Sequence, residues 1–160
     1  MPELTDKFQT LFSSYSGMFT ATHHNGNSRN AVLASLSKDV GVYVIFRKAD
    51  SKCPIYIGSA GKIETGTAGL IYNGSTILKR ISGASTPYHL NGSTNEFEYD
   101  PTTSGVPPAG YGATIPLADI EFACITKITS CWLAPTVLEH LLIQGFINQF
   151  GRLPDVNQKI

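Results

Sequence analysis

Apolar side chains alternate with the period of a β-strand in two neighbouring segments near the middle of the chain. In the segment that begins at Gly41, alternation places Tyr43 and Ile45 on one face. The other face takes Val42, Val44 and Phe46. A link of turn composition, residues 49–53, leads to a second segment that opens with Pro54, and the two segments predict a β-hairpin.

The hairpin places two phenols close together. If the turn centres near Ala49-Asp50, Tyr43 lies opposite Tyr56, with Cβ atoms ~5 Å apart. A cross-strand aromatic pair also stabilises a sheet without any chemistry, so the pair alone leaves a structural and a functional interpretation open.

Helical spacing appears in two segments after the hairpin. Residues 75–83 predict a short helix, with Ser75 as N-cap, Gly83 at the C′ position and Arg80 beside the buried stripe. That stripe consists of Ile77, Leu78 and Ile81. Residues 135–150 predict a longer helix with Glu139 near its start. Its apolar face carries Leu138, Leu142, Gly145 and Phe146.

The remaining regions predict an N-terminal extension, two insertions and a third strand. Before the hairpin, residues 4–15 have helical spacing, and Ser28 is a candidate N-cap of a second short helix, which together predict an N-terminal helical extension over residues 1–39. Residues 61–74 and 85–116 are rich in glycine and polar residues and are predicted to be insertions, the second a long loop. Residues 120–128 predict a third strand.

The chain is therefore expected to form one α/β domain over residues 1–160, with a small three-stranded antiparallel sheet flanked by helices. Its core spans residues 40–157. A length of 160 residues with 42% hydrophobic side chains suits a single domain with a substantial core.

Glu139 and Arg80 each allow an ordinary structural interpretation. Thr136 to Glu139 fits an S/T-x-x-E capping box, in which the glutamate would bond the Thr136 backbone N–H. A lone arginine on a short helix is commonly a solvated residue. Both alternatives weaken once these residues are taken together with the two tyrosines.

In that order, the residues resemble the GIY-YIG nuclease family. The signature reads Gly41-Val42-Tyr43 and Tyr56-Ile57-Gly58, the family's helical arginine matches Arg80, and its helical glutamate matches Glu139. Its terminal asparagine matches Asn157. The gap between the tyrosines is slightly longer than is usual in the family, and Ala84 stands where many members carry His or Tyr.

The resemblance implies a metal-dependent endonuclease that hydrolyses DNA phosphodiester bonds. Tyr43, Tyr56, Arg80 and Glu139 would be catalytic, with Glu139 holding a single Mg²⁺ or Mn²⁺ ion. One carboxylate suffices because Mg²⁺ keeps several of its waters. Either tyrosine would act as or support the general base, and Arg80 would contact the scissile phosphate. The DNA-binding or supporting residues would be Lys62, Lys79, His89 and Asn157.

Charge and composition limit this expectation. Twelve basic and 12 acidic residues give no net charge, which argues mildly against strong binding of nucleic acid and suggests help from a homodimer or a DNA-binding partner. A second hypothesis is therefore a degenerate GIY-YIG module that binds nucleic acid or protein without cleavage. Because both insertions lie within the core, a restriction-type or compact standalone nuclease leads.

Several other classes are excluded or disfavoured. Ile63 follows Gly58-Ser59-Ala60-Gly61-Lys62, where a phosphate-binding loop needs Ser or Thr for Mg²⁺. Three cysteines without C-x-x-C spacing support neither a disulfide framework nor a thiolate zinc site. No apolar run approaches the ~18 residues that span a bilayer, and no signal peptide is evident, so a cytoplasmic, intracellular protein is expected.

Overall fold

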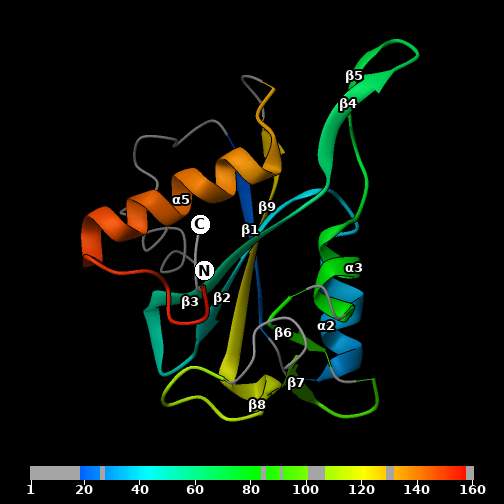
Figure 1. Cartoon of the computed structure of the whole chain (residues 1–160). Coiled ribbons are helices and arrows are strands. Elements are labelled where there is room, and N and C mark those ends of the chain that lie inside the picture. Colours follow the sequence, from blue (N-terminus) through cyan, green and yellow to red (C-terminus); the bar gives the residue numbers. More distant parts are fainter. Residues whose placement is uncertain are drawn as a thin grey trace.

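A central antiparallel sheet organises the protein (Figure 1). The computed structural model describes residues 19–25, 28–83, 86–90, 92–100, 107–128 and 132–157. The strands are β1 (Phe19–Asn25), β2 (Gly41–Arg47), β3 (Asp50–Ala60), β4 (Lys62–Gly66), β5 (Gly69–Asn73), β6 (Tyr88–Leu90), β7 (Glu96–Tyr99), β8 (Thr114–Pro116) and β9 (Ile120–Ile128). The helices are α2 (Arg29–Ser35), α3 (Ile77–Ser82), the 3₁₀ turn η2 (Leu117–Asp119) and α5 (Pro135–Phe150).

The central sheet has four strands in the order β1-β9-β2-β3, and every pairing in it is antiparallel. The expected mixed α/β class is confirmed, as are the strands β2, β3 and β9. The predicted strand number is wrong for this sheet, because β1 pairs with β9. That segment, Phe19–Asn25, was expected to belong to a helical extension; the helix expected at residues 4–15 lies outside the described residues.

The strand β2 is buried on both faces, and each face packs against a different layer. One face carries Val42, Val44 and Phe46. These side chains form a buried cluster with Leu138 and Leu142 of α5. On the opposite face, Tyr43 and Ile45 join a larger core to which α2, α3 and the strands β6–β8 contribute. Figure 1 shows α5 on one side of the sheet and α2 and α3 on the other. The alternation seen in the sequence thus corresponds to two separate cores.

The two insertions are folded elements. Residues 61–74 form the β4–β5 hairpin, which projects away from the rest of the molecule (Figure 1). The second insertion, expected to be a long loop, contains a three-stranded antiparallel sheet of order β6-β7-β8. Its inward side chains, among them Leu90, Phe97 and Ile115, belong to the larger core. Strands of three or four residues carry too few alternating positions for the pattern to stand out from turn composition.

The pairing register of the β2–β3 hairpin differs from the expected one. Tyr43 lies opposite Gly58, and Tyr56 lies opposite Ile45. The ladder is irregular between Ile45 and Arg47, where β3 has more residues than the β2 segment opposite it. Such bulges lengthen one strand relative to the other and shift the register beyond them. The two tyrosines are consequently diagonal neighbours on one face.

Local signals explain the helix ends. Ser28 is the N-cap of α2, accepting a hydrogen bond of 3.2 Å from the Ala31 N–H. The N-cap of α3 is Thr76, one residue beyond the expected Ser75, and Gly83 ends the helix in an extended conformation. The bounds expected for α5 are confirmed. None of the helices in the described ranges is long and apolar enough to cross a membrane.

Candidate functional site

Tyr43 and Tyr56 form a contacting pair on the face of the sheet opposite α5. Their ring centroids lie 5.9 Å apart, with the planes inclined by 39°. Tyr43 is 1% exposed, whereas Tyr56 is only partly buried. The hydrogen-bonding contact between the two side chains raises the pKa of Tyr43 and lowers that of Tyr56. Tyr56 is therefore the more exposed phenol of the pair.

Gly58 is the residue that lets the two rings occupy this position. A Cβ atom at Gly58 would lie 2.6 Å from the Tyr43 hydroxyl and 2.7 Å from Cε1 of Tyr56. Those distances are far inside van der Waals contact, so both rings lie directly over the glycine. The other signature glycine, Gly41, serves a different contact, because a Cβ there would lie 2.1 Å from the Ile125 carbonyl oxygen of β9.

Gly58→Ala should displace both phenols. We expect a loss of unfolding free energy of about 1–3 kcal/mol, as for an overpacked core, together with a loss of whatever function the phenol pair performs. Gly92→Ala is the matched control, because no atom lies within 4 Å of a Cβ at that position. Urea unfolding of the two variants measures the difference, and equal stability would contradict the close packing over Gly58.

Both phenols are neutral at physiological pH in this environment. Burial, followed by the negative charge of Glu139, raises the pKa of Tyr56 to about 12. Burial, followed by the neighbouring Tyr56, raises the pKa of Tyr43 well above its usual value. The positive charge of Arg80 acts in the opposite direction and lowers the pKa of both groups. Each hydroxyl thus keeps its proton unless further positive charge is added.

Arg80 projects from α3, a short helix whose Ile77 and Ile81 are buried in the larger core. The helix holds the guanidinium close enough to both phenols for its charge to shift their pKa values. Its Nε atom is buried and has no hydrogen-bond partner among the described residues. A buried donor without a partner is costly, so this nitrogen lacks the acceptor that would offset its burial.

Glu139 lies in the second turn of α5 and faces β3. Its carboxylate accepts a hydrogen bond from the Ser59 hydroxyl. The N-cap of α5 is Ala134, and no side chain caps the helix, so the capping-box alternative for Thr136 and Glu139 is wrong. Pro135 at the first helical position starts the helix earlier than that box requires.

Sequence reasoning missed Ser59, although alternation contained a signal for it. Tyr56 and Gly58 point to one face of β3, so Ile57 and Ser59 point to the other, where α5 packs. Ser59 lies opposite Val42, a residue of the core beneath α5. The carboxylate and the phenols therefore approach the edge strand from opposite faces of the sheet. The charge of Glu139 still reaches Tyr56, where it is the second-largest cause of the raised pKa.

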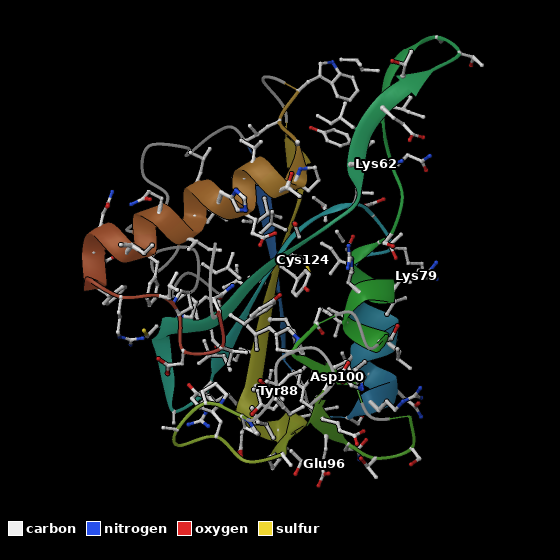
Figure 2. All side chains as sticks on the ribbon, in the orientation of Figure 1. Lys62, Lys79, Tyr88, Glu96, Asp100 and Cys124 are labelled. Atoms are coloured by element: carbon white, nitrogen blue, oxygen red, sulfur yellow. The ribbon has the colours of Figure 1, made fainter. Side chains whose placement is uncertain are left out.

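The four expected supporting residues have different environments. Lys62 begins the projecting hairpin, and its ammonium group pairs with Glu64 at 2.9 Å. Lys79 is exposed on α3, next to Arg80 (Figure 2). His89 lies in β6, which packs against α3, and its Nδ1 atom is buried with no partner among the residues described. Lys62 is thus partly neutralised, and Lys79 and His89 lie on or against the element that carries Arg80.

Asn157 has a structural role. Its side-chain amide donates to the Ile57 carbonyl and accepts from the Ile57 N–H, both at 2.9 Å. A third hydrogen bond, of 2.8 Å, joins the Val156 N–H to the Ile55 carbonyl. The last described residues therefore cover the free edge of β3 beside Tyr56. Asn157 supports the signature strand, and both polar atoms of its amide bond the backbone of Ile57 there.

The possible metal ligands are few. No group of three or more His, Cys, Asp or Glu side chains forms a metal cluster within the described ranges. Cys53 is half-buried and Cys124 is buried, and neither is in a disulfide. The donor set at the site is a single carboxylate, Glu139, with the Ser59 hydroxyl beside it. Such a set fits a hard ion such as Mg²⁺, which retains waters and takes one or two protein oxygens.

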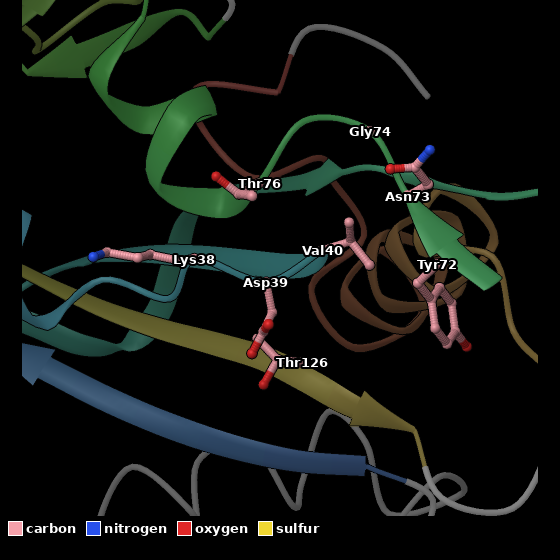
Figure 3. A pocket seen from close by; sticks show the side chains of 8 residues that line it. All are labelled: Lys38, Asp39, Val40, Tyr72, Asn73, Gly74, Thr76 and Thr126. Atoms are coloured by element: carbon pink, nitrogen blue, oxygen red, sulfur yellow. The ribbon is translucent and has the colours of Figure 1, made fainter.

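Comparison of the chain with protein-family models, with curated proteins and with solved structures finds no match. Support for a function therefore comes from the geometry of the site itself. Two open hollows in the described surface, of about 450 and 420 Å³, lie elsewhere. The first, shown in Figure 3, opens between the hairpin base at Tyr72, the start of α3 at Thr76 and the segment around Asp39. Neither hollow is lined by the two tyrosines, Arg80 or Glu139.

Proposed function

We propose that this protein is a metal-dependent endonuclease of the GIY-YIG type that hydrolyses DNA phosphodiester bonds. One observation carries the proposal: the charges of Arg80 and Glu139 both act on Tyr43 and Tyr56, although the four side chains come from four separate elements. They span almost a hundred positions of the sequence, in the order of the family signature. Packing of the sheet is enough to explain a pair of tyrosines. It does not explain a guanidinium and a carboxylate beside that pair.

Arg80 is the phosphate-binding group in this proposal. Its unpartnered Nε supplies one donor, and the fork geometry of a guanidinium lets it hold two phosphate oxygens. Charge on those oxygens grows in the transition state of phosphodiester hydrolysis, so a fixed cation there accelerates the reaction. Arg80 would thus satisfy its buried donor and stabilise the transition state through the same contact.

Glu139 would hold the divalent ion, and Ser59 would orient its carboxylate. When bound, the ion would polarise a phosphate oxygen and lower the pKa of a water nucleophile. Ser59 donates to one carboxylate oxygen and leaves the other for the ion. The two residues meet on the face of β3 that packs against α5.

Tyr56 is the better candidate for the proton-accepting or water-orienting phenol. It is the more exposed of the pair, and its hydrogen-bonding contact with Tyr43 lowers its pKa, which favours its ionised form. With a pKa of about 12, however, Tyr56 is protonated at neutral pH, and the positive charge of a bound metal ion would be needed to favour its ionised form. Tyr43, 1% exposed, would position Tyr56 and would not touch substrate.

Tyr56→Phe should therefore lower the cleavage rate more than Tyr43→Phe does. General-base catalysis contributes about 10²–10⁴-fold, and we expect a loss in that range for Tyr56→Phe. Tyr99→Phe is the control, because it removes a hydroxyl from a buried tyrosine of the small sheet. Single-turnover cleavage of plasmid DNA in Mg²⁺ compares the variants. If both Tyr43→Phe and Tyr56→Phe cleave at the wild-type rate, the tyrosine pair is only a packing contact.

The alternative function, a degenerate module that binds nucleic acid or protein without cleavage, also has support. The lone carboxylate, the neutral phenols and the absence of net charge favour it. A plasmid-nicking assay with Mg²⁺ and with Mn²⁺ separates the two hypotheses. DNA binding without nicking in either metal would favour the degenerate module, and metal-dependent nicking would favour the nuclease.

A further inference from the structure

The β4–β5 hairpin is an arm without net charge, and its strand β5 has a free edge. Within the described parts of the chain, β4 and β5 pair only with each other. Residues 65–73 carry no charge, and the two charged side chains of the hairpin, Lys62 and Glu64, neutralise each other at its base. An isolated two-stranded hairpin with an apolar edge is marginally stable and tends to pair with another strand.

Large apolar side chains of the arm are exposed. Leu70 is 48% exposed and Ile71 is 41% exposed, on opposite faces of β5. At the base of the arm Tyr72 stacks on Trp132, with ring centroids 5.1 Å apart, and Trp132 is itself 52% exposed. The Tyr72 hydroxyl donates to the Leu133 carbonyl at 3.0 Å, which anchors the arm to the segment before α5. The arm is thus held firmly at its base, while its tip is free.

We propose that β5 pairs antiparallel with β5 of a second copy of this chain. In a two-fold arrangement centred on Ile71, that residue faces its own counterpart and Leu70 faces Tyr72 of the other copy. No charge opposes a like charge in this register, because residues 69–73 are uncharged. The only cation of the arm, Lys62, is paired with Glu64, so little positive charge draws the arm to phosphate, and the chain has no net charge to keep copies apart.

The pairing joins two five-residue strands and the exposed rings beside them. It continues the β4–β5 ladder into a four-stranded sheet across the two-fold axis, which satisfies the free edge of β5 in both copies. An interface of this kind is at the small end of the range for specific association, so we expect dimers at about 100 µM protein and monomers well below that concentration. The inference is independent of the proposed nuclease activity.

Sedimentation velocity of the full chain across that concentration range, without DNA, tests the pairing. Ile71→Lys places two ammonium groups opposite each other and should abolish the dimer. Thr67→Lys is the matched control: it adds the same charge to the same arm, at the turn between β4 and β5, and should leave the dimer intact. Circular dichroism and a thermal melt verify that both variants fold.

A cross-linking experiment gives a second readout. Ile71→Cys should form an intermolecular disulfide with its counterpart under mild oxidation, since the Cα atoms of directly opposite residues in an antiparallel pair lie about 4.5–5.5 Å apart, a separation that a disulfide spans. Thr67→Cys and the parent chain should not. A monomer at all concentrations, a dimer unaffected by Ile71→Lys, or association only in the presence of DNA would each overturn the proposal. None of these outcomes bears on whether the protein cleaves DNA.

Discussion

Glu139→Gln should abolish metal-dependent cleavage while leaving the melting temperature nearly unchanged. The amide keeps the size of the carboxylate and an oxygen that accepts from Ser59, so the packing between α5 and β3 is preserved. It loses the charge that would hold a divalent ion. Lewis-acid stabilisation by such an ion supplies several kcal/mol, and each 1.36 kcal/mol is tenfold in rate, so we expect a loss of at least about 10³-fold.

The control for this variant is Glu98→Gln, which removes an exposed glutamate from β7 and should be silent. Plasmid nicking across a range of Mg²⁺ and Mn²⁺ concentrations measures both proteins. Ser59→Ala gives an intermediate case: it should raise the metal concentration needed for half-maximal rate, because the carboxylate would lose its orienting donor. Normal cleavage by Glu139→Gln would remove Glu139 from the proposed site.

Arg80→Lys should lower the rate of bond cleavage far more than it weakens DNA binding. An ammonium cannot reproduce the planar fork of donors that holds two phosphate oxygens, and the buried Nε position would lose its donor. Because the contact strengthens as charge develops on the phosphate, the loss appears in kcat. Removal of a single transition-state donor typically costs about 10²–10³-fold, and we expect an effect of that size.

Lys79→Ala is the matched control for Arg80→Lys, because Lys79 is the neighbouring cation on α3 and is exposed. It should weaken binding slightly in a salt-dependent manner and leave single-turnover cleavage at saturating enzyme unchanged. If Arg80 only attracted DNA, Arg80→Lys would behave in this same way. Near wild-type chemistry in Arg80→Lys would then exclude it from the catalytic residues.

The pattern of side chains along the chain determined the elements that depend on local periodicity. Alternation predicted β2 and assigned Tyr43 and Val42 to opposite faces, and these faces are separate cores in the structure. Helical spacing with Pro135 at its start predicted α5 with its bounds. A period of 2 or 3.6 residues is a local property, so these elements can be predicted without knowledge of their partners.

Only the tertiary structure decided features that depend on distant partners. The bulges near Phe46 moved Tyr43 opposite Gly58, and β1 joined the sheet because β9 offered it a free edge. Glu139 accepts its hydrogen bond from Ser59, eighty positions earlier in the chain. The Asn157 side chain is hydrogen-bonded to the backbone of Ile57, a hundred positions earlier. Local spacing carries no information about such pairings, because they arise only when separate elements pack against one another.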